Sequence, residues 1–276
     1  MSAVIVNTEI LVPGPAQALG ALLDVPVPAV ADGEGLPLLW HWVYLLDRPA
    51  QADLGPDGHP VRGTVPAPPG PGLRRMWAGG RVRASGVLRC GEPATRRSRV
   101  MSAEEKQGRS GPLTFVTVHH QILQFARVVV DEQQDLVYRP AAGSAGQQAP
   151  ADAADPVAPP GDGERSIDVS PTLLFRFSAL TYNAHRIHYD RDYARDVEGY
   201  PGLLTHGPLQ ALAMAEAARA LGWAGATVFE YRLLAPLFDQ QGMLVRAVQD
   251  AHSITTTVRD LHGRQTATGT LRSLDA

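Results

Sequence analysis

The sequence has a single cysteine, Cys90, so it cannot form a disulfide within one chain. It also lacks any run of about 18 uninterrupted apolar residues, the usual pattern of a membrane-spanning helix. Residues 1–25 have no basic start, and Pro13 and Pro15 interrupt their apolar run, unlike a signal peptide. Together these absences predict a cytoplasmic protein, in a reducing compartment, with no membrane association.

An excess of one charge is absent as well. The chain has 25 Lys and Arg against 28 Asp and Glu, a formal net charge of −3, which argues against nucleic-acid binding. No P-loop, dinucleotide-binding glycine pattern or paired-cysteine metal site occurs, so we expect no cofactor and no metal. His119 and His120 are adjacent, and neighbours on a strand face opposite ways, so they are not expected to share an ion.

What the sequence does contain is enough apolar material, 44% of 276 residues, for one large domain or two small ones. Residues 140–165 interrupt it with five prolines, many Ala and Gly, and only Val157 as a larger apolar residue. Such a segment buries too little surface to offset its ordering entropy. We therefore predict an N-terminal unit over 1–139, a flexible linker over 140–165 and a C-terminal unit over 166–276.

The C-terminal unit has the clearer pattern. Residues 207–221 predict a helix, because Pro208 suits a first turn, Ala and Leu dominate, and Gly222 follows its end. So few polar side chains indicate a helix buried on most sides. Strands are predicted near 226–234, 242–250, 252–260 and 264–272. One buried helix wrapped by an antiparallel meander is the pattern of a hot-dog fold.

The N-terminal unit repeats this order loosely. The apolar stretch 36–46 takes the place of the central helix, although its aromatic and β-branched residues suit a strand equally well. A Pro- and Gly-rich loop at 55–72 precedes the strands, and a loop of that length is usually functional or mobile. Strands are predicted near 76–89, 96–102, 113–124, 126–131 and 135–139. The predicted fold class is α+β, a double hot-dog of two antiparallel sheets that each wrap a central helix.

Most of the predicted chemistry lies between Phe177 and Gly207. Three histidines and an amide occur there beside the predicted buried helix: Asn183, His185, His188 and His206. Histidine is the side chain best suited to proton transfer near neutral pH. The alternative is that these histidines only cap or line a loop.

This segment resembles the motif of the MaoC-like hydratases. The pattern SALTYNAHRIHYD over Ser178–Asp190, followed by His206-Gly207, is similar to the branch that contains the 3-methylfumaryl-CoA (mesaconyl-CoA) hydratases and the type 2 hydroxyacyl-thioester dehydratases. The likeness extends to LWHWVYLL at 39–46, GHPVRG at 58–63, RRMWAGGR at 74–81, GRSGPLTFVTVHH at 108–120 and EQQDLVYR at 132–139. It therefore covers nearly the whole chain.

The resemblance implies a hydro-lyase that adds or removes water across the double bond of an α,β-unsaturated acyl thioester. His188 falls at the family's catalytic histidine and is expected to be the base for water. The wider family has an aspartate where this chain has Asn183, which cannot accept a proton and is expected to hold the water or the His188 ring. The Gly207 N–H, at a helix start, is expected to stabilise the thioester oxygen. His185 and His206 are placed at the substrate.

A carboxylate supplied from elsewhere would compensate for Asn183. Asp190 and Asp192 are the near candidates, and the competing interpretation makes them the N-cap of a short helix over 192–197.

Residues 60–110 hold eleven Arg or Lys against three Glu, which suits coenzyme A phosphates or an acidic acyl-carrier protein. Arg62, Arg74 and Arg75 flank the long loop and are the preferred candidates, although solvated strand faces would show the same excess. The expected partners are thus an acyl-CoA or acyl-carrier-protein thioester, with a homodimer compatible. The site of the N-terminal unit is expected to be degenerate.

Three other functions compete with hydration. A hot-dog thioesterase often uses a carboxylate on the central helix, and Glu216 lies there. A non-catalytic acyl-binding protein would explain the loss of the aspartate. A repurposed enzyme would use the same pocket for another reaction.

Overall fold

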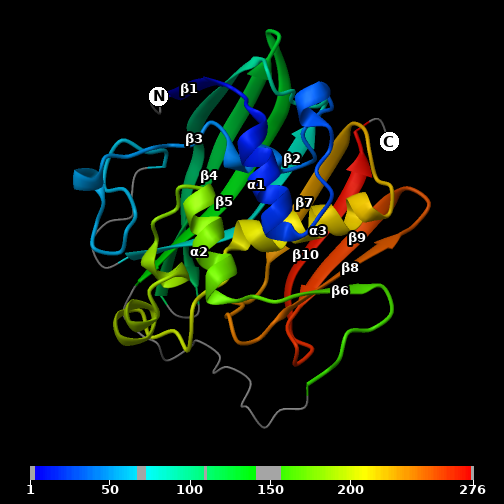
Figure 1. Cartoon of the computed structure of the whole chain (residues 1–276). Helices are drawn as coiled ribbons and strands as arrows, with labels where there is room; N and C mark the ends of the chain where they lie inside the picture. The colour runs from blue at the N-terminus through cyan, green and yellow to red at the C-terminus, as the bar shows by residue number, and fades with distance from the viewer. Residues whose placement is uncertain (1–3, 67–72, 109–110, 141–156, 275–276) are drawn as a thin grey trace.

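The computed structural model describes residues 4–66, 73–108, 111–140 and 157–274. Ten strands form one continuous antiparallel sheet in the order β1-β3-β4-β5-β2-β7-β10-β9-β8-β6, with the helices on one face (Figure 1). The strands are β1 Ile5–Ile10, β2 Leu73–Ala84, β3 Pro93–Gly108, β4 Gly111–Gln124, β5 Arg127–Pro140, β6 Glu164–Ile167, β7 Thr227–Leu233, β8 Met243–Gln249, β9 Ser253–Arg259 and β10 Gln265–Ser273.

The two halves of this sheet repeat one topology. Along the chain, each half begins with a short edge strand, continues with one or more helices, and then adds four strands. In the sheet, the strands of the two halves lie in the matching orders β1-β3-β4-β5-β2 and β6-β8-β9-β10-β7. The halves join where β2 pairs with β7, from Gly79 opposite Arg232 to Ala84 opposite Thr227. This repeat confirms the predicted α+β double hot-dog.

Helix α3, Gly207–Ala220, is the central helix of the C-terminal half and packs on β8, β9 and β10. Pro208 lies in its first turn, and nine of its fourteen residues are buried, including the polar Gln210 and Glu216. The helix predicted over 207–221 and the four strands predicted after it are confirmed.

The helix predicted over 36–46 is wrong. Only Trp40–Val43 form a single 3₁₀ turn, and the left-handed backbone of Leu39 and Leu45 interrupts the segment on both sides. The helix of the N-terminal half is α1, Pro13–Leu23, whose prolines lie in the first turn. A proline in the first turn of a helix loses no helical hydrogen bond. Pro13 and Pro15 therefore interrupt the apolar run in the sequence and also begin the helix.

The strand predictions of the N-terminal half are close but incomplete. The runs at 126–131 and 135–139 form one strand, β5, because the polar residues between them continue it. The edge strands β1 and β6 and the helix α2, Pro171–Leu180, were not predicted. Of the predicted linker over 140–165, residues 141–156 lie outside the described residues, and Glu164 already begins β6.

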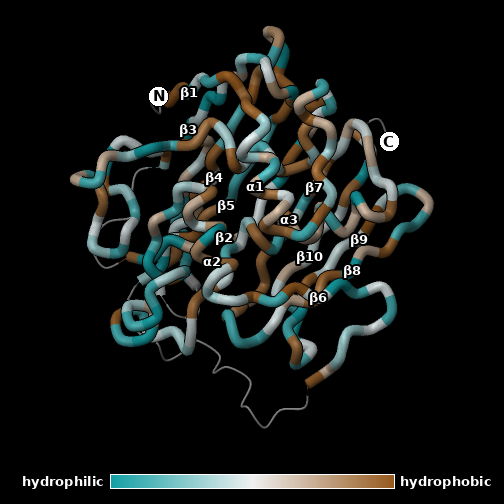
Figure 2. The backbone as a smooth tube through the Cα atoms, viewed as in Figure 1, coloured by the Kyte–Doolittle hydropathy of each residue, from teal (hydrophilic) through white to brown (hydrophobic). Residues whose placement is uncertain are grey.

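Burial alternates along the strands as expected for a sheet with one covered face; in β9 every second residue is buried. Figure 2 shows the same mixture of hydrophobic and hydrophilic positions along the strands. Among the helices of the described chain, none has the length and apolar character needed to cross a membrane.

Candidate active site

The turn into α3 places a histidine and a free backbone donor at the helix start. His206 is the N-cap, in extended conformation, and its carbonyl accepts the N–H of Leu209 and Gln210. Gly207 precedes these bonds, so its N–H belongs to the group without a helical partner and carries the positive end of the helix dipole. A Cβ at Gly207 would overlap the Leu233 side chain, so the close packing of β7 favours glycine here.

Asn183 is held by its own turn. Tyr182, just before it, has left-handed backbone with φ 54°. The Asn183 Oδ1 accepts the N–H of His185 at 3.0 Å, and its own N–H donates to the Ser178 carbonyl at 2.8 Å. Because the side-chain oxygen is engaged, the amide NH₂ is the group available to the cavity that Asn183 lines.

His188 is buried in the form that a general base requires. Its Nδ1 donates to the Leu204 carbonyl at 2.7 Å, which leaves Nε2 as the acceptor. Burial lowers the pKa of His188 to about 4, against the opposing effect of the Leu204 hydrogen bond, and the charge of His59 lowers it further. The ring is therefore neutral at neutral pH.

The three predicted histidines form a row of rings. His206 stacks on His188 with centroids 3.6 Å apart, and His185 meets His188 edge-on at 5.5 Å. His206 Nε2 shares a hydrogen bond of 2.9 Å with Ser178 Oγ, while its buried Nδ1 has no partner among the described residues. Burial, reinforced by the neighbouring histidines, lowers the pKa of both His185 and His206 far below the ordinary value.

A loop of the N-terminal half docks on this row. The Asp57 carbonyl accepts the Arg186 N–H at 2.9 Å, and a Cβ at Gly58, whose φ is 87°, would overlap the Ala184 carbonyl oxygen. The loop brings His59, whose ring lies 3.9 Å from that of His185. Sequence reasoning missed Asp57 and His59, although GHPVRG at 58–63 carried part of the family resemblance.

Asp57, His59 and His185 are also of the kinds that bind metal ions, and their ligand atoms lie within 4.8 Å of one another. Two of these atoms are already joined, since His59 Nδ1 and Asp57 Oδ2 share a hydrogen bond of 3.0 Å. Among the described residues, no fourth such ligand joins them. We therefore interpret the group as a carboxylate–imidazole pair beside a third ring.

A cavity of about 210 Å³ lies at the junction of the two halves. From the C-terminal half, Asn183, His206 and Pro208 line it, with Phe177 and Thr181 of the α2 region. From the N-terminal half come mainly polar and aromatic side chains: His41, Trp42, Tyr44, Asp47, Trp77, Arg96, His120, Glu132 and Gln134. His188 and His185 are not among the lining residues; the ring of His188 stacks on that of His206, which does line the cavity.

Glu132 organises the N-terminal wall of this cavity. It is 2% exposed, and its carboxylate accepts from His41 Nε2 at 2.9 Å, Trp42 Nε1 at 3.0 Å and Gln134 Nε2 at 2.7 Å. Burial raises the pKa of Glu132, but the hydrogen bond and charge of His41 and its other partners outweigh it and hold the pKa at about 2. The group is a buried carboxylate that stays ionised.

Two polar atoms on the same wall remain unpaired. His120 shares a hydrogen bond of 2.7 Å with Ser98 through Nδ1, while its buried Nε2 has no partner among the described residues. Arg96 pairs with Asp47, but its Nε is likewise unpaired. Sequence reasoning missed these residues; the only signal was polar side chains inside otherwise strand-like runs.

The predicted arginines lie in different places. Arg74 pairs with Glu198 at 2.7 Å, and Arg75 donates to the Pro66 carbonyl at 3.4 Å. Both are near enough for their charge to lower the pKa of His185. Arg62 pairs with Asp53 on the loop and is largely exposed.

The candidate carboxylates have other partners. Asp190 accepts the Tyr193 N–H at 3.0 Å, as predicted for a helix cap, and also pairs with Arg186 at 2.7 Å. Asp192 is exposed beside Arg195. Neither therefore replaces the family aspartate.

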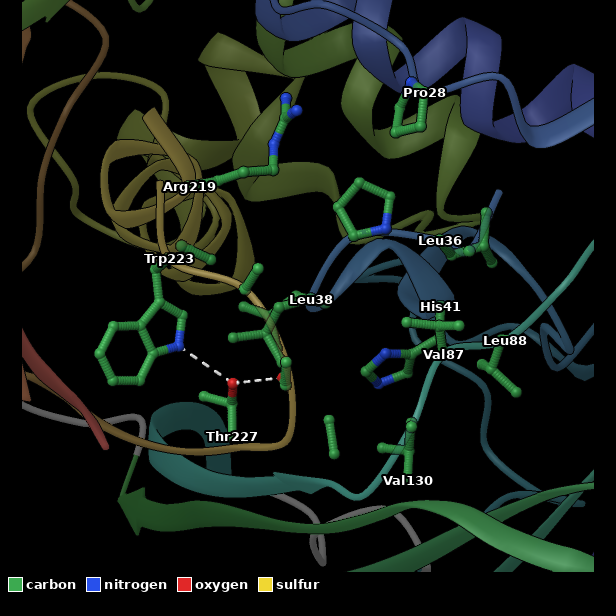
Figure 3. Close-up of a pocket in the computed structure, with 18 of the residues that line it drawn as sticks. Pro28, Leu36, Leu38, His41, Val87, Leu88, Val130, Arg219, Trp223 and Thr227 are labelled. Carbon is green, nitrogen blue, oxygen red and sulfur yellow. Dashed lines mark hydrogen bonds between the residues drawn. The ribbon is translucent and has the colours of Figure 1, made fainter. Parts of the chain in front are cut away.

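Glu216 is buried on α3 and accepts from Trp40 Nε1 at 2.8 Å and from Arg219 at 2.6 Å. It borders a second cavity of about 250 Å³, between α3 and the segment around Leu36 and Leu38, in which Trp223 donates to Thr227 at 3.0 Å (Figure 3). Asn183, His188 and Gly207 do not line that cavity. The carboxylate required by a thioesterase is therefore engaged in a network away from the histidine row.

Comparison with known proteins decides the family. The family described as hydroxyacyl-thioester dehydratase type 2 matches residues 39–239. The chain belongs to this family. It is 48% identical over 223 residues, 80% of this chain and 78% of the relative, to the mesaconyl-C(4)-CoA hydratase of Chloroflexus aurantiacus. The predictions of a hydro-lyase of acyl thioesters and of a MaoC-like relationship are confirmed.

Solved structures agree on the fold. The structure of HtdX from Mycobacterium tuberculosis superposes with a TM-score of 0.70 at 16% identity and covers 99% of this chain and 100% of HtdX. A second M. tuberculosis protein, described as having a double hotdog fold, superposes with a TM-score of 0.58 at 16% identity over 98% of this chain and 94% of its own.

Proposed function

We propose that this hydro-lyase acts on a short enoyl-CoA whose acyl group ends in a polar or charged group, with mesaconyl-C4-CoA as the reference compound. The observation that carries the proposal is the junction cavity, in which Asn183 and His206 face a wall built on Glu132, Arg96 and His120. At about 210 Å³ it is smaller than the roughly 300–1,000 Å³ of pockets for drug-sized ligands.

The lining favours a polar acyl end. The Nε of Arg96 and the Nε2 of His120 are already buried without a partner among the described residues, and a long saturated chain would offer them no hydrogen bond. A polar acyl end that paired with them would gain about 1–3 kcal/mol for each group. The charge of Glu132 is already offset by three donors and so opposes an acidic acyl end less than a bare carboxylate would.

The geometry of the C-terminal half supports the catalytic roles that we propose. His188, neutral and with Nε2 as acceptor, takes a proton from water as the oxygen attacks the β-carbon. The Gly207 N–H at the start of α3 stabilises the enolate-like oxygen of the thioester. The Asn183 amide donates to the attacking water or to the substrate. Arg74 and Arg75, beside the row, and Arg62 on the loop serve the coenzyme A phosphates.

Incubation with a panel of thioesters tests the substrate class. Mesaconyl-C4-CoA, crotonyl-CoA and 2-dodecenoyl-CoA are compared by mass spectrometry for the gain of one water, together with the reverse reaction. We expect kcat/KM for mesaconyl-C4-CoA to exceed that for 2-dodecenoyl-CoA by at least about a hundredfold, the discrimination of roughly 3 kcal/mol that two unpaired polar groups can supply. Faster turnover of the dodecenoyl thioester would refute the polar acyl end and leave the hydro-lyase chemistry standing.

A further inference from the structure

The catalytic segment has one group too few for proton transfer. Hydration moves two protons, one away from water and one onto the α-carbon, and the family's aspartate shares this work with the histidine. Here Asn183 cannot hold a proton. His185 and His206 are neutral and buried, Asp190 is bound to Arg186, and Asp192 is exposed.

A carboxylate does reach the row from the other half of the molecule. Asp57 is ionised: burial raises the pKa of its carboxyl, but the hydrogen bond and charge of His59 outweigh this and leave the pKa below its usual value. The backbone of the pair is held in place, because the Asp57 carbonyl accepts the backbone N–H of Arg186 and the Pro56 carbonyl accepts from the Arg186 guanidinium at 3.0 Å. Gly58 packs so closely against Ala184 that an added Cβ would overlap the Ala184 carbonyl.

His59 has the position of a group that exchanges protons. Its side chain is 22% exposed, so one side is open to solvent or substrate, while its ring lies 3.9 Å from that of His185. Its charge is felt at both His185 and His188, which places it within electrostatic reach of the base. With Nδ1 engaged by Asp57, Nε2 is the atom that can give or take a proton.

We propose that Asp57 and His59 are the second proton-transfer pair of the site and take the place of the carboxylate missing at Asn183. This inference rests on the proposed catalytic roles of His188 and Gly207. As the water oxygen bonds to the β-carbon, His188 Nε2 takes one water proton and the π electrons move toward the α-carbon and the thioester oxygen. His59 Nε2 delivers a proton to the α-carbon, directly or through one water, and Asp57 stabilises its cationic form. Proton transfer from His188 back to His59 restores both groups.

The test uses His59→Gln, Asp57→Asn and the double variant Asp57→Asn with Asn183→Asp, in the full chain and with the best thioester of the panel. His59→Gln should lower kcat by about a hundredfold or more, as for a general acid–base group, with KM changed less than threefold. Asp57→Asn should lower kcat by about tenfold or more. Adding Asn183→Asp to it should recover at least half of that loss, because the carboxylate returns at the family position.

Two controls distinguish chemistry from folding. Val61→Ala alters an exposed residue of the same loop and should keep the wild-type kcat. His59→Ala should regain activity on addition of free imidazole, because the removed ring is partly open to solvent. Wild-type kcat in His59→Gln, no recovery in the double variant, or equal loss in Val61→Ala would overturn the proposal. Loss of wild-type activity in EDTA, restored by Zn²⁺, would instead make the group a metal site. The wild-type rate tests the hydratase function separately.

Discussion

The two halves of the sheet share one strand order but distribute their polar groups differently. In the C-terminal half, the proposed catalytic groups lie on a loop and a helix start, where His188 and Asn183 are held by hydrogen bonds to the backbone and Gly207 begins α3. In the N-terminal half, Glu132 and His120 face the cavity from the strands of the sheet itself. The two halves thus contribute different kinds of elements to one cavity: a loop and a helix start from the C-terminal half, and strands from the N-terminal half.

The largest effect should come from His188→Ala. Turnover should fall by about a hundred- to ten-thousandfold while thioester affinity changes little, because the ring acts in the transition state. Steady-state kinetics with calorimetric binding of the product thioester measure both. Val197→Ala, an exposed change on the following helical turn, is the control and should retain wild-type kcat. Full activity in His188→Ala would remove the C-terminal half from the chemistry.

Two buried groups, one in each half, should lose their contribution to stability in different acid ranges. His188 has a pKa of about 4 in the folded state against 6.5 unfolded. The unfolded chain therefore binds a proton first, and stability falls as pH drops from 6.5 toward 4. Glu132 has a pKa of about 2 against 4.5, so its contribution is present above pH 4.5 and is lost as pH falls toward 2. Each of these two groups should account for about 3 kcal/mol.

Urea denaturation across these pH values measures the two ranges separately. His185, His206 and His120 also have lowered pKa values and contribute to the upper range, so His188→Gln should remove about 3 kcal/mol of the dependence there and leave the rest. Glu132→Gln should remove about 3 kcal/mol from the lower range. A single variant that flattens both ranges would show that the two halves titrate as one network.

The secondary structure could be predicted from the sequence more fully in the C-terminal half than in the N-terminal half. Helix α3 and the strands after it were predicted within a residue or two, because an Ala-rich apolar helix and Thr- and Val-rich strands have strong local patterns. The helix α1 was missed because its two prolines were interpreted as breaks in an apolar run, whereas they lie in the first turn of the helix. The role of Glu132 was missed because its burial depends on partners from residues 41–42, which only the tertiary structure brings to β5.

The candidate site residues also fall into a group that the sequence predicted and a group that it did not. Asn183, His188 and Gly207 were predicted because they are close in sequence and fit a known motif, whereas the proposed pair of Asp57 and His59 lies more than a hundred residues away. Their approach depends on the docking of one loop, which composition does not encode.

A smaller effect is expected at the junction of α3 and β7. Gly207→Ala should cost about 1–3 kcal/mol of stability by overpacking against Leu233, and should lower kcat about tenfold by shifting the helix start. Combining it with Leu233→Ala creates the missing space. The double variant should regain kcat relative to Gly207→Ala; if it does not, the Gly207 N–H is displaced for another reason. Thermal unfolding and kinetics follow the pair.

The smallest effect should come from Glu216→Gln. Its carboxylate pairs with Arg219 and Trp40 away from the histidine row, so kcat should stay within about twofold of wild type. Release of free thiol from acyl-CoA, followed with a thiol reagent, should remain at background in both proteins. Thiol release that disappears in Glu216→Gln would make the protein a thioesterase.

The pairing of β2 with β7 has a consequence for how such a protein diversifies. When two identical chains build a sheet of this kind, every substitution appears twice, once on each side of the symmetry axis, and a residue that suits one side must be tolerated on the other. Here one chain supplies both sides. A buried glutamate on β5 therefore requires no glutamate at the matching position of β10, and the cavity wall and the start of α3 are free to change one at a time.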